Sequence, residues 1–130
     1  MTDTTPAPAK FSFIKLIVHD LDRVEHFYAQ AFGMKRVGEF ETPTIEEAIL
    51  RGASGFSLVL YRWKDGRSLD LGTAYGPIGF AVPDVDTAYH HALAHGAGDS
   101  RAPANYGTTR AAFITDPEGH EVELVGGVPG

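Results

Sequence analysis

The stretch VHDLDRVEHFYAQAFG, residues 18–33, decides the fold, because a related stretch, VPDVDTAYHHALAHG, begins 64 residues later at residues 82–96. In each copy an apolar segment leads to an Asp-x-Asp sequence, whose first aspartate is suited to cap the start of a helix. Each helix is expected to end at a glycine, Gly33 or Gly96. Apolar residues recur at helical spacing in both copies, which predicts two helices that each pack one face on a sheet.

Short strand candidates, rather than further helical patterns, follow each predicted helix. These candidates are residues 36–40, 47–50 and 56–62 in the first half, and 99–102, 111–115 and 120–125 in the second half. Glycine-containing turns at 52–55 and 116–119 are suited to join the last two strands of each half. With the strand before each helix, each half is expected to be βαβββ, which makes the chain an α+β protein. The alternative is that two unrelated βα units resemble each other by chance.

The length and composition fit one globular domain with one hydrophobic core. The chain has 130 residues, of which 43% are hydrophobic and 22% are charged. We expect residues 1–9 to form a disordered tail, since they offer little apolar surface to bury. Residues 10–126 are expected to form the single domain, with one module at about 10–63 and a second at about 75–126.

The composition also argues against several classes of function. The chain has no cysteine, which excludes disulfides, thiolate metal sites and cysteine nucleophiles. Its formal net charge of -6 argues against binding to nucleic acid. No apolar run is long enough to span a membrane, and the first residues contain no apolar secretory leader. We therefore expect a cytoplasmic protein without nucleic-acid or membrane partners.

The two copies, together with AFITDPEGHEVEL at residues 112–124, resemble the vicinal oxygen chelate superfamily. This superfamily includes glyoxalase I, extradiol dioxygenases, epimerases and bleomycin-binding proteins. The segments LGTAYG at 71–76 and YGTT at 106–109 are most similar to glyoxalase I, or lactoylglutathione lyase. The resemblance implies two βαβββ modules that form a curved mixed sheet with both helices on its convex side. It also implies a homodimer.

The resemblance further implies where a metal would be bound. Enzymes of this superfamily hold a divalent metal (Zn, Ni, Fe or Mn) with one side chain from the first and last strand of each module. Here those positions are Phe13 and Pro77, 64 residues apart, and Leu58 and Glu123, 65 apart. Only Glu123 carries a donor atom, whereas such metals normally need at least three protein ligands. We therefore expect no metal cofactor. The alternative is a metal held through unexpected residues.

In the expected register, one face of the strands forms an apolar pocket with a few charges, which is typical of small-molecule sites. The ligand-binding candidates on the strands are Phe13, Lys15, Ile17, Leu58, Leu60, Arg62, Pro77 and Glu121. Trp63, Tyr75 and Tyr106 lie on connecting segments and either stack on a flat ligand or pack as ordinary aromatic residues. Ile17 and Arg62 stand where glyoxalase I has an arginine and an asparagine for glutathione. Glutathione chemistry is therefore not expected.

Glu123 is the candidate catalytic residue. Among apolar neighbours it could act as a general base or acid. Alternatively it could only pair with Lys15 or Arg62, because buried carboxylates need partners. Lys15 either binds an acidic or carbonyl group of a ligand or balances the charge of Glu123. His120 is expected to point away from Glu123 by strand alternation, as a structural or surface residue.

Three functions are compatible with these residues. The first is a metal-independent pocket that encloses an apolar or aromatic small molecule. The second is a cofactor-free isomerase or lyase that uses Glu123 as general base on a small carbonyl compound. The third is a divalent-metal enzyme of the glyoxalase or dioxygenase type with non-standard ligands.

Overall fold

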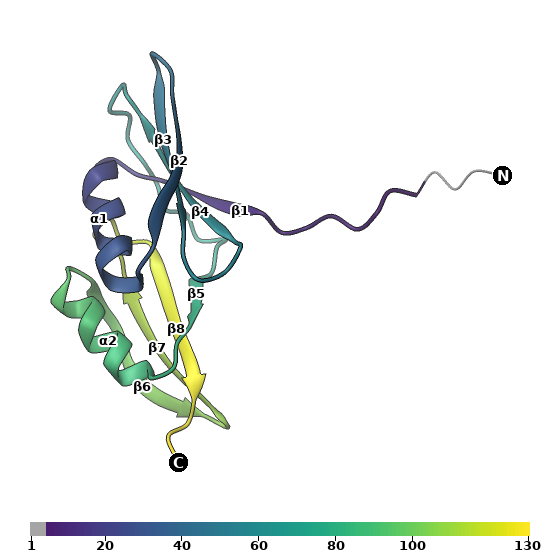
Figure 1. Ribbon diagram of the computed structural model, residues 1–130. Coiled ribbons are helices and arrows are strands. Elements are labelled where there is room, and N and C mark those ends of the chain that lie inside the picture. The colour runs from purple at the N-terminus through teal and green to yellow at the C-terminus, as the bar shows by residue number, and fades with distance from the viewer. Residues whose placement is uncertain (1–4) are drawn as a thin grey trace.

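The computed structural model describes residues 5–130, which form two βαβββ modules (Figure 1). Module one contains β1 (Phe13–Ile17), α1 (Leu21–Phe32), β2 (Lys35–Glu41), β3 (Ile45–Arg51) and β4 (Ser57–Trp63). Module two contains β5 (Ile78–Ala81), α2 (Val85–Ala94), β6 (Gly98–Tyr106), β7 (Thr109–Thr115) and β8 (Glu121–Gly127). This element order confirms the predicted α+β class and the internal repeat.

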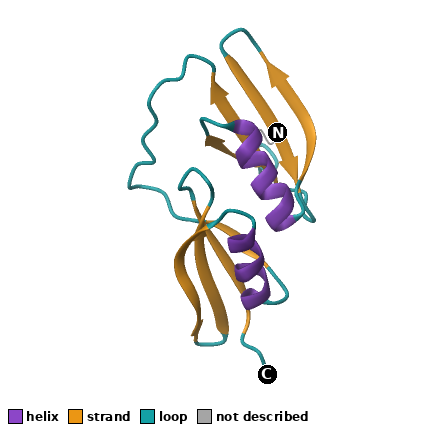
Figure 2. Cartoon of the chain, turned by 90° about the vertical axis from the view of Figure 1, so that its left-hand side faces the viewer, coloured by secondary structure: helices purple, strands orange, loops and turns teal. Residues whose placement is uncertain are grey.

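Hydrogen bonds join the strands into two sheets of four, one in each module. The strand orders are β1-β4-β3-β2 and β5-β8-β7-β6, so β1 and β5 are edge strands. In both sheets the edge strand pairs in parallel with the last strand of its module, and the other pairs are antiparallel. The expected curved sheet is therefore divided between the modules, which lie one above the other in Figure 2.

Both helices begin as the sequence predicts. The Asp20 carboxylate accepts a hydrogen bond from the backbone N–H of Arg23, and the Asp84 carboxylate accepts one from that of Thr87. Helix α1 is followed by Gly33 at φ 68°, a left-handed conformation that costs glycine little because it has no Cβ. Each aspartate therefore marks the place where the chain leaves a strand and enters a helix.

The hydrophobic core lies between the helices and the sheets, since both helices cover the same side of the molecule (Figure 1). Its largest fully buried side chains are Tyr28, Phe27, Leu50, Leu60, Ile114 and Leu124. The modules join at the helix-covered side, where the Phe32 ring stacks on Phe80 with centroids 4.2 Å apart. The Glu118 carboxylate also accepts the backbone N–H groups of His19 and Asp20 at 2.7 and 2.6 Å. These contacts fasten module two to the start and end of α1.

The predicted disordered tail, residues 1–9, lies partly outside the described residues, because residues 1–4 are not described. Residues 5–9 form neither helix nor strand and are exposed. None of the helices in the described part of the chain is long and apolar enough to cross a membrane. The cytoplasmic location stays a prediction.

Candidate functional site

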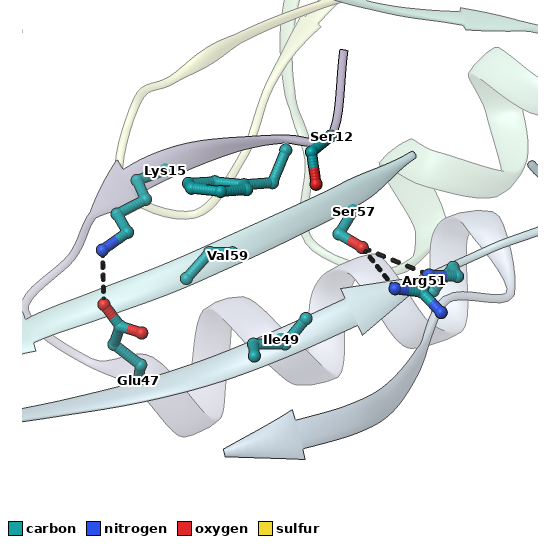
Figure 3. Close-up of a pocket in the computed structure, with 8 residues that line it drawn as sticks. Ser12, Lys15, Glu47, Ile49, Arg51, Ser57 and Val59 are labelled. Atoms are coloured by element: carbon teal, nitrogen blue, oxygen red, sulfur yellow. Dashed lines mark hydrogen bonds and ion pairs between the residues drawn. The ribbon is translucent and has the colours of Figure 1, made fainter. Parts of the chain in front are cut away.

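The face of the module-one sheet that α1 does not cover, which we call the open face, carries a cavity of about 260 Å³. Strand β1 pairs with β4 so that Phe13 lies opposite Ser57 and Lys15 opposite Val59. Paired residues of neighbouring strands point to the same face of a sheet. The cavity is lined by Ser12, Phe13, Lys15, Glu47, Ile49, Arg51, Ser57 and Val59 (Figure 3). Phe13 and Lys15, both predicted as ligand-binding residues, thus share one cavity.

Two polar pairs lie at opposite ends of this cavity (Figure 3). At one end the Lys15 ammonium lies 2.6 Å from a Glu47 carboxylate oxygen. At the other end Arg51 donates from Nε and Nη2 to the Ser57 hydroxyl, at 3.2 and 3.1 Å. The side chains of Ile49 and Val59 lie between the pairs, as Figure 3 shows. The arrangement is an apolar strip with a charged group at each end.

Three residues predicted for this face lie on the other one. Leu58 and Leu60 are 2% and 0% exposed and belong to the hydrophobic core beneath the helices. Arg62, on the same side by alternation, pairs its Nε with Glu46 at 2.6 Å. The predicted register of β4 is therefore wrong by one residue, because a slip of one position moves every side chain to the opposite face. The neighbours Ser57 and Val59 occupy the open face instead.

Glu123 lies on the open face of module two, opposite Gly79 on β5 and Phe113 on β7. Its side chain is partly buried, and within residues 5–130 it takes part in no hydrogen bond or ion pair. The two expected partners are engaged elsewhere, Lys15 with Glu47 and Arg62 with Glu46. The interpretation of Glu123 as the partner of Lys15 or Arg62 is therefore wrong within one chain.

A second cavity, of about 570 Å³, lies between the edge of β1, the segment that connects the modules and the start of β8. Its lining includes Lys15, Ile17, Trp63, Tyr75, His120 and Glu121. Five of these six, all except His120, are predicted ligand-binding residues. Pro77 precedes β5 and lines neither cavity, and Tyr106, 47% exposed at the end of β6, lies in neither lining. Sequence reasoning missed Glu47, Ile49, Arg51, Ser57 and Val59.

A buried carboxylate joins the two modules behind this second cavity. Asp116 accepts hydrogen bonds from the Tyr28 hydroxyl of α1 at 2.9 Å and from the backbone N–H groups of Glu118 and His120. The Nδ1 atom of His120 lies 2.8 Å from the same carboxylate. The histidine, expected as structural or surface, is structural.

The charges in this network shift each other's pKa. Burial by itself lowers the pKa of His120, but the hydrogen bond and negative charge of Asp116 outweigh burial and raise it. Burial by itself raises the pKa of Asp116, but the hydrogen bonds and charge of its partners lower it overall. Burial, followed by the charge and hydrogen bond of Asp116, raises the pKa of Tyr28. The network therefore favours an ionised Asp116 beside a protonated His120.

Comparison with known proteins identifies the family. Residues 10–124 match the model of the Glyoxalase/Bleomycin resistance protein/Dioxygenase superfamily. The chain is 31% identical over 125 residues to a lactoylglutathione lyase of Escherichia coli O157:H7, with 85% of this chain and 87% of the relative covered. The chain therefore belongs to this superfamily, and its curated relatives at this similarity include lactoylglutathione lyases.

Solved structures give the same result for the fold. Glyoxalase I from Zea mays has a TM-score of 0.82 at 28% identity over 89% of this chain, which spans 44% of the maize chain. The trypanothione-dependent glyoxalase I of Leishmania major has a TM-score of 0.80 at 25% identity, and the match covers 92% of this chain and 87% of that one. The present chain thus spans less than half of the plant enzyme but most of the Leishmania enzyme.

The strand registers show which residues of the two modules correspond to each other. Lys15 lies opposite Val59 in module one, and Gly79 lies opposite Glu123 in module two, so the modules correspond at a constant offset of 64 residues. Val59, rather than the predicted Leu58, is therefore the counterpart of Glu123. Valine has no donor atom either.

The donor set at these four positions, Phe13, Val59, Pro77 and Glu123, does not fit a divalent metal that needs three or more side-chain ligands. Within residues 5–130, no group of three or more histidine, aspartate or glutamate side chains is placed to hold a metal ion.

Proposed function

We propose that this chain is a metal-independent member of its superfamily that encloses a small apolar or aromatic molecule on the open face. One observation carries the proposal: three of the four positions equivalent to metal ligands hold Phe13, Val59 and Pro77. Two of these, Phe13 and Val59, line the cavity of module one. Two of the places that serve metal chemistry in relatives here supply apolar walls to this cavity.

The cavity has the composition of a small-molecule site. Apolar walls supply the burial of a ligand, and a few polar groups set its orientation. Phe13 is 51% exposed and offers a ring on which a flat ligand can stack. The volume of about 260 Å³ lies slightly below the usual range of such sites, roughly 300 to 1,000 Å³. A second subunit over the open face would extend the enclosure.

Elemental analysis of protein purified without a histidine tag tests the proposal. The protein is incubated with Zn, Ni, Fe(II) or Mn salts, desalted and measured by mass spectrometry for bound metal. We expect less than stoichiometric metal and no turnover of the hemithioacetal of methylglyoxal and glutathione. Stoichiometric metal at a specific site would overturn the proposal and favour the metal enzyme with non-standard ligands.

A matched pair of variants tests the assignment of the four positions. Phe13→His, Val59→Glu and Pro77→His together restore four donors if Val59 is the counterpart of Glu123. The control combination replaces Val59→Glu with Leu58→Glu, which places the carboxylate in the core. Because the control keeps donors at positions 13, 77 and 123, we expect both combinations to bind metal, and the first, with its fourth donor, to bind it more tightly. Equal affinity for metal in the two combinations, or metal binding by neither, would contradict the assignment of Val59.

A second candidate function, proton transfer by Glu123, is favoured by one observation. Glu123 is a partly buried carboxylate that no cation or hydrogen-bond donor of residues 5–130 engages. Such a carboxylate is available to take a proton from a bound carbonyl compound, which would make the protein an isomerase or lyase.

Hydrogen–deuterium exchange tests this second function. Hydroxyacetone and acetoin are incubated with the protein in D₂O, and exchange beside the carbonyl is followed by proton NMR. Exchange that Glu123→Gln abolishes and Glu39→Gln preserves would support a base at Glu123, because Glu39 is an exposed glutamate on β2 that lines neither cavity. Absence of exchange in the unmodified protein, or exchange that survives Glu123→Gln, would contradict it.

We further infer that the chain forms a homodimer. The superfamily resemblance implies a second copy, and large apolar side chains are exposed beside the β1 edge. A second copy would cover these side chains.

A further inference from the structure

We propose that Arg51 is the anion-binding residue of the module-one cavity, and that the ligand is an aromatic carboxylate. This inference rests on the proposed function, because it names the class of ligand that the cavity would enclose. It depends on the hydrogen-bond geometry of Arg51, the charge of the lining and the position of the apolar side chains.

The hydrogen bonds of Arg51 fix its guanidinium and leave one edge free. Its Nε and Nη2 atoms both donate to the Ser57 hydroxyl, whose residue is 4% exposed. A guanidinium presents its N–H donors in a planar fork, and two of them are used here. The Nη1–Nη2 edge remains available, and this edge can bind both oxygens of a carboxylate. Ser57 thus holds Arg51 in place without neutralising it.

Arg51 has no acidic partner among residues 5–130. Arg36, Arg62, Arg67 and Arg110 each form an ion pair with a carboxylate. Arg51 forms none, a property it shares with Arg23 and Arg101. Of these three, Arg51 alone lines one of the two cavities described above. A cation without a counter-ion at the wall of a cavity is placed to receive one from a ligand.

The charge balance of the lining leads to the same inference. The protein has a formal net charge of -6, but this lining contains two cations, Lys15 and Arg51, and one anion, Glu47. Glu47 is paired with Lys15 at 2.6 Å, so the uncompensated positive charge is that of Arg51. An anionic ligand would therefore be attracted to the Arg51 end of the cavity.

The apolar strip decides what the anionic group is attached to. Phe13, Ile49 and Val59 line the cavity together with the two polar pairs. A ligand with its carboxylate on Arg51 would place its body on this strip, where an aromatic ring can stack on Phe13. Its far end would reach the Lys15–Glu47 pair, which can bind a hydroxyl or carbonyl substituent. A body of one or two rings suits a cavity of about 260 Å³.

Two probes that share a ring system test the inference. The ¹⁵N-labelled protein is titrated with 2-naphthoate and with 2-naphthylmethanol, and NMR gives both affinity and location. We expect 2-naphthoate to bind the unmodified protein about tenfold more tightly, because a charged hydrogen bond is worth about 1.4 kcal/mol or more. Chemical shifts should change on β3 and β4 around Ile49, Arg51 and Ser57.

Variants assign the preference to Arg51. In Arg51→Gln the two probes should bind equally, with the affinity for 2-naphthylmethanol unchanged. Arg51→Lys should retain part of the preference, because lysine keeps the charge but not the fork. Arg23→Gln makes the same charge change on the exposed surface of α1 and should preserve the preference in full. Amide spectra that match the unmodified protein show that each variant is folded.

The outcomes separate this inference from the function on which it rests. Equal affinities in the unmodified protein, or a preference that survives Arg51→Gln, would overturn the role of Arg51 and leave the apolar enclosure standing. Chemical-shift changes confined to residues 69–76 would place the ligand in the cavity between the modules. They would also overturn the role of Arg51. Binding of neither probe would overturn both the inference and the proposed enclosure.

Discussion

The ion pair between His120 and Asp116 makes a contribution to stability that depends on pH. Because the pKa of His120 is raised in the folded protein, its contribution is complete below about pH 6.5 and is lost as the pH rises through the folded pKa. Because the pKa of Asp116 is lowered, its contribution is complete above about pH 3.8 and is lost as the pH falls through the folded pKa. The pair therefore stabilises the protein most in the mildly acidic range between these limits.

We expect His120→Gln to lower the free energy of unfolding more at about pH 5.5 than at about pH 9, by a difference on the order of 1 kcal/mol. Glutamine has no charge to lose at the higher pH, and the histidine side chain is only 13% exposed, so solvent screens the pair weakly. Urea unfolding followed by circular dichroism measures both values. The control is His26→Gln, an exposed position on α1. An equal loss at the two pH values would contradict the assignment.

The residue positions in β4 show why sequence reasoning placed part of the site correctly and part wrongly. Phe13 and Lys15 were placed on the open face, as the structure has them. In β4, the four residues from Ser57 to Leu60 are all buried, at 4%, 2%, 4% and 0% exposure. A strand buried on both faces shows no alternation of polar and apolar residues, so its sequence gives no register. Only the pairing with β1 shows that Val59, and not Leu58, lies on the same face as Lys15.

At the scale of the elements, Gly126 sets how closely β8 passes the turn between β5 and α2. A Cβ at this position would lie 2.8 Å from the backbone oxygen of Val82 and 3.1 Å from Val85. The Val82 backbone cannot easily retreat, because its N–H donates to the Val125 carbonyl at 2.9 Å. The start of α2 and the end of β8 therefore pack so closely that position 126 has no room for a Cβ.

We expect Gly126→Ala to lower the free energy of unfolding by about 1 to 3 kcal/mol, the usual cost of forcing an extra methyl group into a packed site. Gly127→Ala is the matched control, since a Cβ there meets nothing within 4 Å and neither glycine has a positive φ. The control should change stability by less than about 0.5 kcal/mol. Urea denaturation of both variants gives the comparison. Similar values for the two would contradict the close approach.

At the scale of the whole molecule, the repeat predicted two modules but not how they join. The junction brings together Tyr28 and Asp116, which are 88 residues apart, and Phe32 and Phe80. Helical periodicity shows that Tyr28 is on a buried face, but it does not show which segment buries it. The two-module architecture could therefore be predicted from the sequence, whereas the buried network and the second cavity could not.

The apolar surface at one edge of module one gives the proposed dimer a physical basis. Four large apolar side chains are exposed in or beside β1: Phe11 at 93%, Phe13 at 51%, Ile14 at 39% and Phe56 at 37%. The segment before β1 extends away from the body of the protein (Figure 1). An edge strand also has backbone groups that can pair with another chain. An apolar, unpaired edge is stable in water when another surface covers it.

We expect light scattering at micromolar concentration to give twice the mass of one chain, and Ile14→Lys to raise the dissociation constant at least about tenfold. A lysine on an edge strand opposes strand pairing and has to be desolvated in an apolar contact. Val37→Lys is the matched control, because Val37 is 53% exposed on β2, the opposite edge of the same sheet. If the unmodified protein is a monomer, the homodimer is wrong. If Val37→Lys weakens the homodimer as much as Ile14→Lys does, the second copy does not dock at the β1 edge. The cavity beside Phe13 would then not be completed by the β1 edge of a second copy.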